Sequence, residues 1–157
     1  MSQLPYTFFI EKPQDVQPTL EVSGCVCVHK GRFLLLKRNL DKPQGGTWCL
    51  PAGKKEKEES PEETAIRELY EETGIKIESI DLNKVGSFFI QHSQGKILFH
   101  TFSLQLTKEP SLNIEEKEHS EHRWAEFHEI DELNLITAGK EVLEICKPYI
   151  NANLDRA

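Results

Sequence analysis

The sequence lacks a long hydrophobic run, an excess of basic residues and an N-terminal basic segment followed by an apolar one. No apolar stretch approaches the roughly 20 residues that a helix needs to span a bilayer, and no signal peptide is recognisable. The chain of 157 residues has 19 Lys and Arg against 26 Asp and Glu, a formal net charge of −7. Because an acidic chain repels phosphate backbones and anionic lipids, we expect no binding to nucleic acids or membranes. These absences predict a soluble, cytoplasmic protein.

Zinc-binding and redox motifs are also missing. No two cysteines have the Cys-x-x-Cys spacing, and none has the Cys/His spacing of a zinc site. Since cysteine packs as a small hydrophobe, we expect four buried free thiols, namely Cys25, Cys27, Cys49 and Cys146.

What the sequence does contain indicates one folded domain. Hydrophobic residues make up 38% of the chain and include 8 Phe and 2 Trp, enough for a core. Residues 1–19 hold three of the eight prolines, and we expect them to form an extended arm lying on the domain. Residues 20–157 contain no repeat, low-complexity tract or linker, so they are predicted to form a single domain.

The hydrophobic pattern predicts a mixed α/β order without a regular βαβ repeat. Strands are expected at 20–28, 32–36, 48–50 and 122–127, β-rich segments at 75–80 and 85–106 with a hairpin turn near 93–95, a polar loop at 108–120, and helices at 61–73 and 138–147. Pro148 is expected to end the second helix.

The first helix carries the clearest local signals. Ser60 is an N-cap residue, Pro61 suits the first helical position, and Glu63 completes a Ser-x-x-Glu capping box. Gly74 is placed to end the helix in the left-handed conformation. We therefore predict a helix from Pro61 to Thr73.

Three glutamates lie within one turn on the side of this helix opposite its apolar stripe: Glu68, Glu71 and Glu72. Cβ atoms at these spacings are about 5–6 Å apart, so the like charges are unfavourable unless a cation lies among them. Mg²⁺ is the natural candidate because it prefers carboxylate oxygens and bridges to phosphates. The alternative is a solvated face on which Arg67 pairs with Glu63 and Glu71.

Residues Gly53 to Ile75 resemble the Nudix box, the signature of the Nudix (MutT-like) hydrolases. The family pattern is Gly, five residues, Glu, seven residues, then Arg-Glu-apolar-x-Glu-Glu-x-Gly-apolar, and every defined position matches. The resemblance implies a Nudix-type α/β/α sandwich around a mixed β-sheet, in agreement with the order of elements above. It extends with less specificity to residues 34–38, 46–53 and 118–124.

The resemblance implies an enzyme that hydrolyses the diphosphate of a nucleoside diphosphate linked to another group, with Mg²⁺ or Mn²⁺ as cofactor. Matching motif positions imply four metal ligands: Glu68, Glu71, Glu72 and the backbone carbonyl of Ala52. The same match implies a structural role for Gly53, Glu59, Arg67 and Gly74. Ala52 stands where many members have Gly, which leaves the substrate subgroup open.

The general base is left open between two places. Family members use either a glutamate of the box, here Glu71, or one from a later loop. In the later loop we favour Glu121, with Glu118 second, against the alternative of a solvated acidic loop.

Three residues outside the box are predicted to contact the substrate. Arg38 is a candidate for a phosphate contact, and Phe89 and His92 for lining the nucleoside pocket, against ordinary strand packing as the alternative. The expected partner is a small molecule, with a nucleotide sugar such as ADP-ribose favoured. The alternatives are a MutT-like (d)NTP pyrophosphatase that releases pyrophosphate and a module that binds a nucleotide without cleaving it. The sequence leaves the oligomeric state, monomer or homodimer, open.

Overall fold

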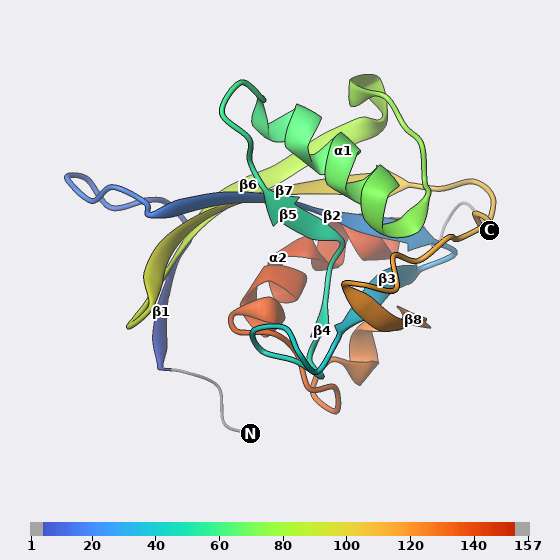
Figure 1. Cartoon of the computed structure of the whole chain (residues 1–157). Coiled ribbons are helices and arrows are strands. Elements are labelled where there is room, and N and C mark those ends of the chain that lie inside the picture. Colours follow the sequence, from blue (N-terminus) through green and yellow to red (C-terminus); the bar gives the residue numbers. More distant parts are fainter. Residues whose placement is uncertain (1–4, 153–157) are drawn as a thin grey trace.

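A computed structural model describes residues 5–152, and within them eight strands form one mixed sheet with a helix on each face (Figure 1). The elements in chain order are β1 (Tyr6–Phe9), β2 (Leu20–His29), β3 (Arg32–Arg38), β4 (Trp48–Cys49), β5 (Ala52–Lys54), α1 (Pro61–Thr73), the 3₁₀ helix η1 (Ser79–Asp81), β6 (Leu82–His92), β7 (Gly95–Gln105), β8 (His119–Ala125), the 3₁₀ helix η2 (Phe127–Glu129) and α2 (Gly139–Ala152).

The sheet has the strand order β1-β6-β7-β2-β3-β4, with β5 paired to β2 and β8 paired to β3. β2 and β7 run parallel, from Leu20 opposite Ile97 to Val28 opposite Gln105, and the other strand pairs are antiparallel. Figure 1 shows α1 over one face of the sheet and α2 over the other. The predicted α/β/α sandwich is therefore confirmed.

Two apolar cores fill the sandwich because neighbouring residues of a strand point to opposite faces. On the α2 side Val26 and Val28 of β2 pack with Val142 and Leu143. On the α1 side the core contains Cys25, Cys27, Leu34, Leu36 and Leu69. All four cysteines are buried and free, as predicted.

The predicted ends of α1 are confirmed. Ser60 Oγ accepts a hydrogen bond from the Glu63 N–H (3.1 Å), and Glu63 Oε1 accepts one from the Ser60 N–H (2.8 Å). Gly74 follows the helix at φ 79°, and its N–H donates to the Tyr70 carbonyl at 2.8 Å. These local contacts fix the two ends of α1 and therefore the positions of its carboxylates along the helix.

Two predictions of local structure are wrong. Residues 75–80 form no strand, because side chains satisfy their backbone: Thr73 Oγ1 accepts from the Ile75 N–H, and Asp81 Oδ2 from the Glu78 N–H. Pro148 lies inside α2 instead of ending it. Pro148 and Glu144, whose carbonyl loses its helical donor, are both exposed, so water can replace the missing hydrogen bond.

Two further boundaries differ from the sequence prediction. The strand predicted at 122–127 is β8, which begins at His119 and ends at Ala125 because it follows β3 as far as Arg38. β5, which includes Gly53 of the box, pairs with β2 and was not predicted as a strand. The predicted hairpin is present, with His92 opposite Gly95.

The segment predicted as an arm contributes β1, which pairs antiparallel with β6 at the edge of the sheet. Tyr6 Oη donates to Glu141 Oε2 of α2 at 2.5 Å. Among the described residues, no helix is both long enough and apolar enough to cross a membrane.

Candidate active site

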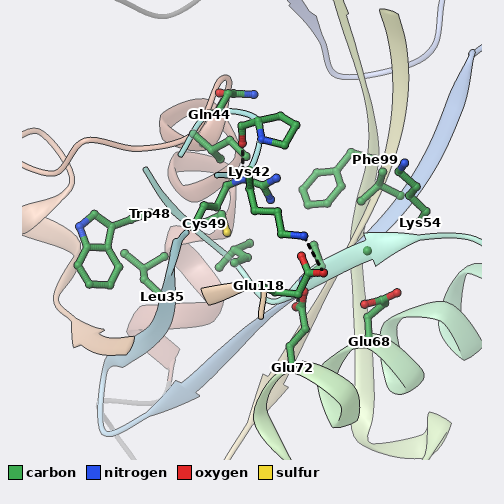
Figure 2. Close-up of a pocket in the computed structure, with 18 of the residues that line it drawn as sticks. Leu35, Lys42, Gln44, Trp48, Cys49, Lys54, Glu68, Glu72, Phe99 and Glu118 are labelled. Atoms are coloured by element: carbon green, nitrogen blue, oxygen red, sulfur yellow. Dashed lines mark hydrogen bonds and ion pairs between the residues drawn. The ribbon is translucent and has the colours of Figure 1, made fainter. Parts of the chain in front are cut away.

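A cleft of about 1320 Å³ opens between the sheet, α1, the first turn of α2 and the loop at 39–47. Figure 2 shows Glu72 and Glu118 facing Lys42 across it, with Phe99 and Lys54 on one side and Trp48 on the other. The residues predicted from the sequence that line this cleft are Arg38, Ala52, Gly53, Glu68, Glu71, Glu72, Gly74, His92 and Glu118. The structure thus brings together most of the predicted site.

Glu72 is the most deeply buried carboxylate of the cleft, with 7% of its surface exposed. Its Oε1 accepts a hydrogen bond from the Ala52 N–H at 2.9 Å, which ties the end of α1 to β5. Burial raises the pKa of Glu72 well above its usual range, and the charges of Glu68 and Glu118 raise it further. A cation placed among these carboxylates would stabilise the charged form.

Glu68 is accommodated by the missing side chain of Gly53. A Cβ atom at position 53 would lie 2.0 Å from Glu68 Cδ and 2.4 Å from Glu68 Oε1, far inside van der Waals contact. Burial raises the pKa of Glu68, while its hydrogen bond with Arg67 lowers it. The box glycine therefore gives this carboxylate its position against β5.

Arg67 organises the acidic side chains on the outer side of α1. It forms a bidentate pair with Glu59, with Nε 2.6 Å from Oε2 and Nη2 3.0 Å from Oε1. Its Nη1 donates to Glu68 Oε1 at 2.8 Å and to Glu71 Oε2 at 3.1 Å, and its Nη2 to the Lys54 carbonyl at 3.0 Å. The hydrogen bonds from Arg67 lower the pKa of Glu59 to about 2.

The donor set fits a hard divalent cation in chemistry, because Glu68, Glu71 and Glu72 offer carboxylate oxygens on one cleft. Within residues 5–152, no three His, Cys, Asp or Glu side chains converge closely enough to hold a metal ion as they stand. Arg67 donates a hydrogen bond to one oxygen each of Glu68 and Glu71, and in the described part of the chain it donates none to the second oxygen of either carboxylate.

Basic side chains lie across the cleft from the acidic helix. Arg38 Nε donates to the Pro43 carbonyl at 2.7 Å, and Lys42 Nζ lies 3.4 Å from Glu118 Oε1. Lys54 lines the cleft beside Gly53. The cleft thus offers both carboxylates for a metal ion and cations for an anionic ligand.

A family model for the NUDIX domain matches residues 17–144, which include the whole cleft-forming sheet except β1. The chain belongs to the Nudix hydrolase family. It is 31% identical over 126 residues to the uncharacterized Nudix hydrolase YvcI of Bacillus subtilis, covering 78% of this chain and 76% of that protein. The predicted class, a hydrolase of phosphoric anhydride bonds, is confirmed.

Two further similar proteins have ADP-ribose in the name of the protein or of its complex. It is 34% identical over 124 residues to the ADP-ribose pyrophosphatase of Bacillus subtilis, covering 76% of this chain and 63%, less than two thirds, of that protein. The NUDIX domain of Shewanella oneidensis NrtR, solved with ADP ribose, superimposes with a TM-score of 0.72 over 89% of this chain and 94% of that one. At 17% identity, that likeness shows the shared fold alone.

The structure places two of the predicted site residues of this Nudix hydrolase, Glu121 and Phe89, outside the cleft. Glu121 does not line the cleft: it lies on β8 opposite Lys37, pairs with Lys37 Nζ at 3.2 Å and is 58% exposed. Phe89 is fully buried, and its ring packs at 6.1 Å from that of Phe9. The register of β8 on β3 turns Glu121 away, and that of β6 on β7 places Phe89 in the core.

His92 is the predicted nucleoside contact that does reach the cleft. Its Nδ1 accepts a hydrogen bond from the Gln94 N–H at 3.1 Å. Because Nδ1 accepts this hydrogen bond, Nε2 is the ring nitrogen of His92 that has no hydrogen-bond partner within residues 5–152.

Several residues that line the cleft were missed by sequence reasoning, among them Lys42, Gln44, Lys54 and Phe99. Lys42 and Gln44 belong to the irregular loop at 39–47, where no periodicity indicates which side chains face inwards. Phe99 and Ile97 lie two residues apart on β7 and both line the cleft, but Leu98 between them is also apolar, so no alternation in the sequence marks this face.

Proposed function

We propose that this Nudix hydrolase is a metal-dependent pyrophosphohydrolase that cleaves the diphosphate of a nucleoside diphosphate linked to another group, with a nucleotide sugar such as ADP-ribose as the favoured substrate. The observation that carries the proposal is the buried Glu72, which lies with Glu68 and Glu118 in a cleft that also contains Arg38 and Lys42. The likeness to an ADP-ribose pyrophosphatase over 76% of the chain supports the substrate class.

Mg²⁺ or Mn²⁺ would be held by Glu68, Glu71, Glu72 and the carbonyl of Ala52, and the bound ion would neutralise the diphosphate and orient the attacking water. The chain itself supplies the positions of these ligands. Ala52 holds Glu72 through its N–H, and Gly53 leaves the space that Glu68 occupies. Arg67 positions the other two carboxylates, Glu68 and Glu71, by donating hydrogen bonds to them.

Arg38 and Lys42 are proposed to bind the phosphates, because both line the cleft across from the acidic helix. Glu118 is proposed as the general base that takes a proton from the attacking water. It lines the cleft, and its charge raises the pKa of Glu72. Glu71 is the second candidate, because its carboxylate is already proposed as a ligand of the metal ion.

A substrate panel tests the proposal. Purified protein is incubated with Mg²⁺ and, separately, ADP-ribose, UDP-sugars, dinucleoside polyphosphates and (d)NTPs, and products are resolved by chromatography. We expect a nucleoside monophosphate and a sugar phosphate from the nucleotide sugars, and no turnover by the Glu72→Gln variant. Turnover of (d)NTPs alone, with pyrophosphate as product, would establish the MutT-like alternative. Nucleotide binding without turnover of any compound would establish the non-catalytic alternative.

A further inference from the structure

The cleft wall formed by β7, β2 and β5 has a row of three side chains that the catalytic proposal does not use. Phe99 of β7 lies opposite Val22 of β2, and Val22 lies opposite Lys54 of β5. Directly paired residues of a sheet point to the same face, and all three line the cleft. An aromatic ring, an aliphatic side chain and an ammonium group therefore follow one another across the strands.

The ring of Phe99 is held by the strand beside it. A Cβ atom at Gly24 would lie 2.6 Å from Phe99 Cζ and 2.8 Å from Cε1, so the ring rests directly against the glycine backbone. Phe99 is half-buried and packs against the core on the α2 side. Leu20 and Ile97, paired in the adjacent row, extend the apolar surface along the cleft. The ring is thus fixed on one side and faces the cleft on the other.

Lys54 places a positive charge at the end of this row. Its backbone carbonyl accepts a hydrogen bond from Arg67 Nη2 at 3.0 Å, which anchors the residue. Its side chain is exposed, and no acidic group within residues 5–152 forms an ion pair with its Nζ. Lys42, by contrast, is paired with Glu118. The charge of Lys54 is therefore available to an anionic group of a ligand in the cleft.

We infer that Phe99, Val22 and Lys54 form a half-site for a nucleoside monophosphate unit, with the base stacked on Phe99 and the phosphate bound to Lys54. Neighbouring strands are about 4.8 Å apart. Phe99 and Lys54 lie two strand spacings apart, so their Cα atoms are separated by about 10 Å. A small molecule that carries both a flat apolar group and an anion matches this arrangement. A plain acyl chain would use the apolar side chains but not the charge of Lys54. The inference rests on the proposed function in taking the phosphate to be one side of the scissile diphosphate.

The half-site is tested by binding, without any need for turnover. Isothermal titration with Mg²⁺ present compares AMP with ribose 5-phosphate, which lacks the base. Base stacking on an aromatic side chain is worth roughly 1–3 kcal/mol, so we expect the wild type to prefer AMP by about tenfold or more. Phe99→Leu should bring the two affinities close together, mainly by weakening AMP. Lys54→Ala should weaken both ligands several-fold, whereas Lys57→Ala, an exposed lysine of the same segment, should leave both unchanged.

Three results would overturn the half-site: equal wild-type affinities, an AMP preference that survives in Phe99→Leu, or equal effects of the Lys54 and Lys57 variants. Thermal melts establish that each variant is folded, and Phe99→Met replaces Phe99→Leu if the latter is not. The proposed function fails separately. If no diphosphate is turned over but the preference for AMP depends on Phe99, the hydrolase proposal is rejected and the half-site is kept. If diphosphates are turned over but Phe99→Leu keeps the preference for AMP, the half-site alone is rejected.

Discussion

The acidic residues around α1 fall into two groups that differ in how their charge is compensated. In the outer group, Glu59, Glu68 and Glu71 each have an oxygen within 3.1 Å of an Arg67 nitrogen. In the inner group, Glu72 is buried and accepts the Ala52 N–H. The difference indicates that charge density alone does not mark the site. The carboxylate buried beside like charges is the position at which we propose that a cation binds.

The largest effect is expected from neutralising the inner group. Glu72→Gln should lower kcat by about 10³-fold, because a ligand of the ion that stabilises charge in the transition state is lost. Glu62→Gln, an exposed glutamate in the first turn of the same helix, is the matched control and should retain full activity. Mg²⁺ should raise the melting temperature of the wild type and the control but not of Glu72→Gln. Activity in Glu72→Gln within tenfold of the wild type would remove Glu72 from the metal site.

Glu118 belongs with the inner group by its position, although it lies outside the box. Glu118→Gln should lower kcat by about 10²-fold with a small change in KM, because a general base acts on the transition state. The measurement is steady-state hydrolysis by the variant and the wild type over a range of substrate concentrations, which separates kcat from KM. A purely raised KM would assign Glu118 to substrate binding through Lys42 instead.

Removing the compensating charge tests the outer group. Arg67→Met leaves the half-buried Glu59 and Glu68 without their cation and should lower the free energy of unfolding by about 2 kcal/mol, less than for a fully buried pair because the site is partly exposed. Arg67→Lys should restore only part of this loss, because lysine supplies the positive charge but cannot form the bidentate contact with Glu59. Urea unfolding measures both variants. A loss below about 0.5 kcal/mol in Arg67→Met would show that the network contributes little to stability.

The buried His119, which follows Glu118 in the sequence, should make the free energy of unfolding depend on pH. Burial, with the charge of Arg38, lowers the pKa of His119 from 6.5 to about 4. The folded state keeps this ring neutral while the unfolded state binds a proton, so stability falls as the pH drops below 6.5 and this loss ends near pH 4. Between about pH 7 and pH 5, the free energy of unfolding of His119→Gln should decrease by about 2 kcal/mol less than that of the wild type. Parallel stability curves for the two proteins would contradict this assignment.

The smallest effect is expected at Glu121, which sequence reasoning favoured as the general base. Its ion pair with Lys37 is exposed, and such pairs contribute little. Glu121→Gln should therefore keep kcat within about twofold of the wild type and leave the melting temperature nearly unchanged. A decrease in kcat as large as that of Glu118→Gln would show that Glu121 takes part in catalysis.

The sequence predicted the helix and its carboxylates well because those signals are local. The Ser60–Glu63 capping box and Gly74 act within a few residues, so they determine the ends of α1 without knowledge of the rest of the chain. The same holds for the spacing of Glu68, Glu71 and Glu72, which requires only a helix.

The strand residues that the sequence did not place correctly depend on strand register. A shift by one residue moves every side chain of a strand to the other face, and register is decided between strands far apart in the chain. Phe89 is buried and Phe99 faces the cleft because Phe88, not Phe89, lies opposite Phe99. Glu121 is outside and Glu118 inside because β8 begins only after Glu118 and shows a register shift at Lys37.

The long-range pairing of β2 with β7 has a consequence for how the molecule forms. Thr19 and Lys96, joined by a backbone hydrogen bond of 2.8 Å at one end of this pairing, are 77 positions apart. During synthesis α1, with its own capping box, leaves the ribosome well before β7 exists to pair with β2. A chain arrested at residue 94 would therefore carry every carboxylate of the box but not the strand that bears Phe99. Since non-local pairing is slow, the catalytic helix is expected to mature early and the substrate cleft late.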